Sequence, residues 1–154
     1  MSPQKIASKV RREVPLLHDD DGLGEAVRRI IDADVPALPV VDAGGRLLGI
    51  FGEREFIGAL FPGYLKTLGH AGFVPRSLDE ALEKRGSCAA ELVGKHMNTD
   101  HIDVGEDFSD TELAEIFLHH RVLIVPIVET GQVTGIVTRE DFFRATAQHV
   151  LSPP

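Results

Sequence analysis

Two stretches of the chain share one pattern of apolar and polar positions. An apolar run, a glycine-containing turn, a second apolar run and a helical segment occupy residues 37–60 and recur over residues 123–150. PVVD at 39–42 matches PIVE at 126–129, and one inserted residue in the first turn is the only break in register. Such duplication indicates two copies of one supersecondary unit, neither of which buries its apolar face alone. We therefore expect the function to lie where the two copies meet.

The spacing of apolar residues predicts the same order of elements in both copies. In the first copy we expect a strand at 15–17, a helix from Leu23, strands at 37–42 and 46–51, and a helix at 53–60. In the second copy we expect a strand at 101–104, a helix at 110–120, strands at 123–129 and 132–137, and a helix at 139–150. The predicted fold class is α+β, with two β-α-β-β-α half-domains.

The predicted boundaries divide the chain into four parts. They are an N-terminal helix or tail (1–13), the first repeat (14–60), a connector (61–90) and the second repeat (91–150). The connector should be helical at 79–85 and 89–96, with loops at 62–64 and 69–75, and it should pack on the flank of the first repeat. Ser109 and Glu112 form a capping-box pattern at the start of the 110–120 helix.

Composition narrows the class of protein. The 154 residues, 43% of them hydrophobic and 26% charged, are typical of a soluble domain or of two half-domains with a shared core. A net charge of −8 argues against non-specific binding to nucleic acid or to anionic membranes. No apolar run approaches the roughly 20 residues that cross a bilayer. The single Cys88, most simply a structural thiol, and the charged N-terminus favour a cytoplasmic protein without membrane insertion.

The motif GIVTRED at 135–141, together with PIVE upstream, resembles the CBS domain, named after cystathionine β-synthase. The resemblance covers about residues 14–60 and 91–147. CBS domains occur in tandem pairs, called Bateman modules. The resemblance therefore implies two half-domains related by a pseudo-twofold axis, with clefts that can hold adenosyl ligands, in a homodimer. The apolar faces of helices 23–34 and 110–120, or the two motif helices, are the candidate dimer interfaces.

By this resemblance, Asp141 would hold the ribose hydroxyls and Thr138 would contact ribose or phosphate. The positions that would face adenine are Thr99, Ile102, Val104, Val122 and Leu123. The chemistry is also sensible from the residues alone, because a carboxylate can accept two hydrogen bonds from a vicinal diol. Thr138 and Arg139 lie at a helix start, which favours phosphate. Thr138 and Asp141 also form a passable capping box, and the two roles are compatible.

The first repeat departs from this motif, because Gly52 replaces the hydroxyl residue and Glu55 replaces the aspartate. Arg54 and Glu55 therefore make a weaker second site, which Phe51 would crowd, and a single occupied cleft should be the one with Asp141. The residues before each strand proline, at 36–37 and 123–124, are uncharged, which weakens the case for tightly bound ATP. AMP or S-adenosylmethionine fits at least as well.

The other groups of histidine and aspartate residues do not indicate a metal site or a catalytic site. His119 and His120 diverge by about 100° on a helix, so they do not readily face one metal ion. Asp19, Asp20 and Asp21 precede a helix, where carboxylates act as caps. Neither a nucleophile–base spacing nor a phosphate-binding glycine loop occurs. We expect no catalytic residue, no metal and no required cofactor.

Together these features predict a regulatory, non-enzymatic module that binds an adenosine-containing ligand: AMP, ADP, ATP or S-adenosylmethionine. It would change the shape of a homodimer and act on an effector protein that the sequence does not identify. The alternative is an interaction scaffold whose clefts stay empty. Gly52 and the uncharged residues before each strand proline favour that alternative.

Overall fold

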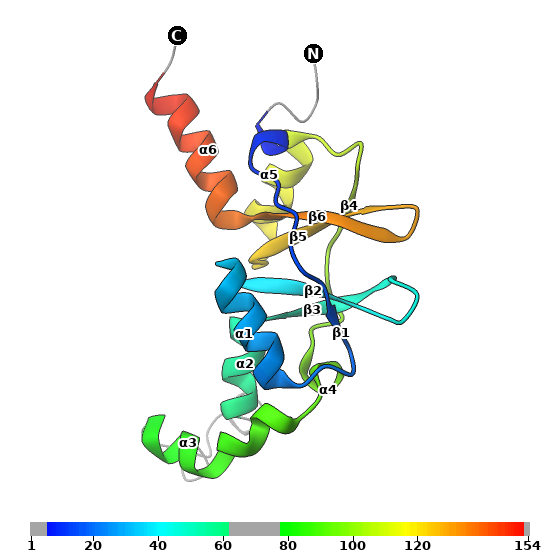
Figure 1. Cartoon of the computed structure of the whole chain (residues 1–154). Helices are drawn as coiled ribbons and strands as arrows, with labels where there is room; N and C mark the ends of the chain where they lie inside the picture. Colours follow the sequence, from blue (N-terminus) through cyan, green and yellow to red (C-terminus); the bar gives the residue numbers. More distant parts are fainter. Residues whose placement is uncertain (1–5, 62–77, 153–154) are drawn as a thin grey trace.

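The computed structural model describes residues 6–61 and 78–152, and the described part folds as two three-stranded sheets with flanking helices (Figure 1). The first repeat consists of β1 (Leu17–His18), α1 (Leu23–Ala33), β2 (Ala37–Val41), β3 (Leu47–Gly52) and α2 (Glu53–Leu60). The second repeat consists of β4 (Val104–Gly105), α5 (Asp110–His119), β5 (Ile124–Glu129), β6 (Gln132–Thr138) and α6 (Arg139–Leu151). The predicted α+β class and the β-α-β-β-α order are confirmed.

The two sheets have one topology. In each, the middle strand pairs in parallel with the short first strand and antiparallel with the last. Even the irregularity in register recurs, between Val40 and Val41 in β2 and between Ile127 and Val128 in β5. The sequence repeat is therefore a repeat of backbone geometry.

The half-domains exchange their leading segments reciprocally, as expected for two copies related by a pseudo-twofold axis. The segment before the first repeat pairs with the second sheet at Arg12 and Ile136, whereas the segment before the second repeat pairs with the first sheet at Asn98 and Ile50. Ile50 and Ile136 occupy matching places in β3 and β6. Each half-domain thus closes the exposed edge of the other half-domain's sheet.

Apolar side chains from both repeats form the core. Ile124 of β5 and Ile136 of β6 pack within the cluster built around the first sheet. A second cluster contains Phe108 and Leu113 of the second repeat and also Ala7, which is fully buried. The N-terminal segment, with its short 3-10 helix η1 (Ala7–Lys9), is therefore part of the second half-domain's packing.

The predicted strand at 101–104 is largely wrong, because β4 comprises only Val104–Gly105. Residues 97–98 lie beside β3 of the first sheet, where Asn98 and Ile50 exchange two backbone hydrogen bonds. The chain must then cross to the second sheet, so residues 99–103 have no strand beside them along which to form a ladder.

The described part of the connector, residues 78–90, packs on the flank of the first repeat, as predicted for the connector. The expected helix at 79–85 is α3 (Leu78–Arg85), and Cys88 is buried in the first core. The expected helix at 89–96 is interrupted: η3 (Gly86–Ala90) and α4 (Val93–His96) are separate. The extended residue Glu91 accepts a hydrogen bond from Leu23 N, which ties the connector to the start of α1.

The predicted loops at 62–64 and 69–75 lie outside the described residues, as do residues 1–5. Within the described ranges, every helix is too short or too polar to span a bilayer.

Candidate functional site

The start of α6 carries the motif side chains of the second repeat. Thr138 ends β6, is 2% exposed, and its Oγ accepts a hydrogen bond from Asp141 N at 3.0 Å. Arg139 N donates to Leu123 O at 2.9 Å, which fixes the turn against the start of β5. The Thr138 half of the predicted capping box is confirmed, whereas the Asp141 carboxylate, which would supply the other half, bonds to Arg12.

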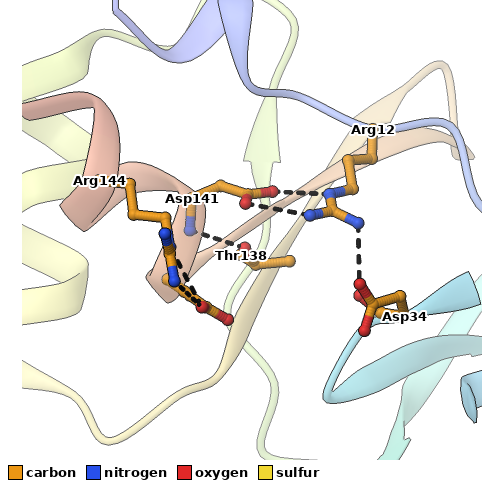
Figure 2. A network of polar contacts seen from close by, with 6 residues as sticks. Arg12, Asp34, Thr138, Asp141 and Arg144 are labelled. Atoms are coloured by element: carbon orange, nitrogen blue, oxygen red, sulfur yellow. Dashed lines mark hydrogen bonds and ion pairs between the residues drawn. The ribbon is translucent and has the colours of Figure 1, made fainter. Parts of the chain in front are cut away.

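The carboxylate of Asp141 is already engaged. The Arg12 guanidinium donates to it in a fork, with Nε–Oδ2 at 2.6 Å and Nη2–Oδ1 at 3.0 Å (Figure 2). Arg12 Nη1 also donates to the backbone oxygen of Asp34, at the end of α1, at 3.3 Å. One side chain therefore links the N-terminal segment, the motif helix α6 and the first half-domain.

This pairing changes the acidity of Asp141. The hydrogen bonds from Arg12 hold the pKa of the Asp141 carboxyl below its ordinary value of 3.8, against the opposing effect of partial burial. The positive charge of Arg12 and the hydroxyl of Thr138 act in the same direction. Asp141 is therefore ionised near neutral pH, the form that accepts hydrogen bonds from a cation or from hydroxyl groups.

Sequence reasoning misses Arg12, because it assigns residues 1–13 to an N-terminal helix or tail outside the repeats. Arg12 and Ile136 exchange two backbone hydrogen bonds of 2.9 Å, and these place the guanidinium beside α6. The only signal in the sequence was indirect. Once two repeats share a pseudo-twofold axis, the segment before each repeat becomes a candidate to lie beside the other repeat's motif.

A surface hollow of about 640 Å³ lies next to this cluster, between the end of α1 and the start of α6. Val35, Pro36, Leu123 and Phe143 give it an apolar wall. Its charged lining consists of Arg139 and three carboxylates: Asp34, Glu53 and Glu140. The hollow is thus wide enough for a flat apolar group, and its charged rim is more acidic than basic.

The motif of the first repeat is arranged differently. Glu55 accepts a hydrogen bond from Gly52 N at 2.9 Å, so its carboxylate caps its own helix. Burial raises the pKa of Glu55, partly offset by this backbone hydrogen bond. Arg54 Nη1 donates to the backbone oxygen of Arg121 at 3.0 Å. A hollow of only about 40 Å³ remains beside Arg54 and Glu55.

The structure distributes the predicted ligand-binding residues over two places. Thr138, Arg139 and Asp141 lie together at the start of α6. Val122 instead lines the small hollow with Arg54 and Glu55, and Leu123 lies between the two hollows.

The remaining three predicted positions fall elsewhere. Val104 is buried in the second core, Thr99 is exposed, and Ile102 is half-buried. Sequence reasoning does not suggest Arg12, which bonds to Asp141, or Asp34 and Val35, which line the neighbouring hollow. In the described part of the chain, no group of three or more His, Cys, Asp or Glu side chains could hold a metal ion.

Comparison with known proteins agrees with this architecture. The family described as "CBS domain" matches residues 6–62 and 90–148. The chain is 26% identical over 150 residues to the protein MJ1404 of Methanocaldococcus jannaschii; the match covers 96% of this chain but only 33% of that protein. The chain therefore spans about a third of this relative's length.

Two solved structures show the same fold. The CBS-domain protein ATU1752 of Agrobacterium tumefaciens aligns with a TM-score of 0.69 at 24% identity, covering 93% of this chain and 91% of the other. CBSX2, solved in complex with AMP, aligns with a TM-score of 0.63 at 20% identity, covering 90% and 92%. The duplicated sequence, the two matching sheets and the two matched regions lead to one conclusion: the chain is a tandem pair of CBS domains and belongs to the CBS-domain family.

Proposed function

We propose that this chain is a regulatory module that binds an adenosine-containing ligand at the start of α6, with the ribose on Asp141. The observation that carries the proposal is an ionised carboxylate, 18% exposed, at a capped helix start whose adjoining residues Arg139 and Glu140 line a hollow of about 640 Å³ with an apolar wall. Ligand sites commonly combine an apolar wall with a few placed polar groups. The complex of CBSX2 with AMP supports adenosine as the ligand class.

The charges around the hollow favour ligands without a polyphosphate. Among the described residues that line it, the charged ones are three carboxylates (Asp34, Glu53 and Glu140) and one cation, Arg139. A triphosphate would bring several negative charges toward these three carboxylates, whereas the sulfonium and ammonium groups of S-adenosylmethionine would be attracted to them. We therefore expect S-adenosylmethionine to bind more tightly than AMP, and AMP more tightly than ADP or ATP.

Calorimetric titration with AMP, ADP, ATP and S-adenosylmethionine tests both points. Asp141→Ala should abolish the heat of binding, because it removes the acceptor for the diol. Glu115→Ala, which removes an exposed carboxylate from α5, is the matched control and should leave binding unchanged. Binding that survives Asp141→Ala would show that the ribose site is elsewhere.

A scaffold with empty clefts is the second candidate function, and one observation favours it: Asp141 already has a partner in Arg12. In that case the pair serves stability, and no adenosyl compound gives heat with the wild-type protein or with any variant that frees Asp141. The scaffold and the sensor therefore differ in a measurable way.

Both functions would use a homodimer. Large apolar side chains are exposed on several helices, among them Ile31 on α1, Leu118 on α5 and Phe143 on α6. We propose that a second copy covers part of this surface, since exposed apolar area favours association. Light scattering after size exclusion should give twice the chain mass, and Ile31→Lys or Leu118→Lys should shift it toward one chain. A monomeric wild-type protein would contradict this.

A further inference from the structure

The Arg12 guanidinium occupies the atoms that a ribose would need. Both oxygens of Asp141 accept from it, one from Nε and one from Nη2. A vicinal diol would donate to the same two oxygens in the same side-by-side manner. The Asp141 side chain is only 18% exposed, so little of the carboxylate remains open to another donor. A diol can therefore be held by Asp141 only after the fork has opened.

Opening the fork is sterically simple, because the Arg12 side chain is 37% exposed. Its backbone is held to Ile136 by two hydrogen bonds, which do not depend on the guanidinium. Rotation of the side chain into solvent would break the contacts with Asp141 and with the backbone oxygen of Asp34. The strand pairing could stay intact.

Arg12 belongs to a segment, residues 6–12, that is anchored on the second half-domain by three carboxylates. Asp110 accepts from the backbone N–H groups of Ile6 and Ala7 at 2.8 and 2.9 Å. Glu106 accepts a fork from Arg11 at 2.7 and 2.9 Å. Asp141 is the third anchor, and of the three it alone lies in the CBS motif.

We propose that Arg12 is an internal competitor for the ligand at Asp141, so that ligand binding releases the third anchor of residues 6–12 and the contact with Asp34. This inference rests on the proposed ribose role of Asp141 and adds its regulation. Ligand and fork are coupled, because each can hold Asp141 only when the other has left. The ligand therefore loosens the link between the half-domains that passes through Arg12.

Arg12→Gln tests the competition, since it removes both the charge and the fork. Calorimetry with AMP and S-adenosylmethionine should give a Kd about tenfold lower than for the wild-type protein, the gain expected when one charge-assisted contact no longer has to be broken. Arg12→Lys, which keeps the charge but cannot form the fork, should fall between the two. It also serves as the test protein if Arg12→Gln does not fold.

Arg11→Gln is the matched control. It removes an arginine fork from the same segment, but one bound to Glu106. A merely structural role of the segment would change affinity equally in both variants, whereas competition changes it only for Arg12. We expect the Kd of Arg11→Gln to stay within twofold of the wild-type value.

A second readout follows the guanidinium directly. The Arg12 Nε–H resonance, assigned by its absence in Arg12→Gln, should move to the position of a solvent-exposed arginine when AMP or S-adenosylmethionine is added. The Arg11 resonance should stay where it is.

The outcomes separate the two proposals. Equal affinity of wild-type and Arg12→Gln, or an unmoved Nε–H resonance in the bound state, would overturn the competition and leave the ligand site standing. Weaker binding by Arg12→Gln would also overturn it, because Arg12 would then contact the ligand. Absence of heat with both proteins would overturn the adenosine site itself and the competition with it. Binding seen only with Arg12→Gln would support both proposals.

Discussion

The ends of β3 and β6 enter their helices through equivalent turns, yet the acidic side chains of the two turns have different partners. In the first repeat Gly52 has no side chain, and Glu55 folds back to cap Gly52 N at 2.9 Å. In the second repeat Thr138 supplies a cap to Asp141 N, and the Asp141 carboxylate reaches Arg12. A hydroxyl at the helix start and an aspartate three residues later leave the carboxylate free for a long-range partner.

The surroundings of Gly52 explain why the first repeat lacks that hydroxyl. A Cβ atom at Gly52 would lie 2.5 Å from Pro36 O and closer still to the Cβ of Ala37. Glu53 N meanwhile donates to Pro36 O, which holds the two backbones together. The absence of a side chain at position 52 therefore lets the end of β3 approach the start of β2 closely.

The largest expected effect comes from placing threonine, the residue of the second repeat at this turn, at position 52 of the first repeat. Gly52→Thr should lower the free energy of unfolding by about 3 kcal/mol, because the backbone must move to admit the side chain. Urea unfolding measures the loss. Gly58→Ala in α2, where an added Cβ meets nothing within 4 Å, is the control and should not destabilise. A Gly52→Thr protein as stable as wild type would show that the turn is less tightly packed than described.

A smaller difference in unfolding free energy should distinguish the carboxylates of Asp141 and Glu55. Asp141→Asn weakens a charge-assisted fork, and we expect a loss of about 1 kcal/mol, since the partly exposed Arg12 is screened by solvent. Glu55→Gln keeps an oxygen that can accept from Gly52 N, so its unfolding free energy should stay within about 0.5 kcal/mol of wild type. Urea unfolding of both variants near neutral pH checks this. A larger loss for Glu55→Gln would mean that its charge contributes to the fold.

The smallest expected effect is on the pH dependence of stability, to which Glu55 and Asp141 should contribute with opposite signs. The pKa of Glu55 is raised above 4.5, so its stabilising contribution is full below the unfolded value and is lost as pH rises through the folded value. The pKa of Asp141 is lowered below 3.8, so its contribution is present above the unfolded value and is lost as pH falls through the folded value.

Urea unfolding between about pH 6 and pH 3 should therefore show two trends. On acidification, wild type should gain stability relative to Glu55→Gln and lose its advantage over Asp141→Asn. Carboxyl resonances followed by NMR would give both pKa values directly. Two carboxyls that titrate at their ordinary values would contradict the difference between the sites.

Much of the fold could be predicted because it is encoded by local patterns. The bounds of α2 and the start of α6 follow from the polar residues after each apolar run. The Ser109 half of the predicted capping box is present, with Glu112 N donating to Ser109 Oγ at 3.0 Å. The prediction failed where the chain crosses between half-domains. Residues 101–104 alternate polar and apolar positions as a strand would, but in the described part of the chain residues 101–103 have no strand beside them. Glu91 is extended where its backbone oxygen bonds to the start of α1.

The sequence by itself determined the duplication, the order of elements in each half-domain and the candidate carboxylates, because these depend on residues close together in the chain. Only the tertiary structure decided that Asp141 meets Arg12, 129 positions earlier. That contact exists because each leading segment crosses to the other half-domain's sheet. Such pairing is fixed by the packing of two sheets into one core, so no periodicity or spacing within either repeat encodes it.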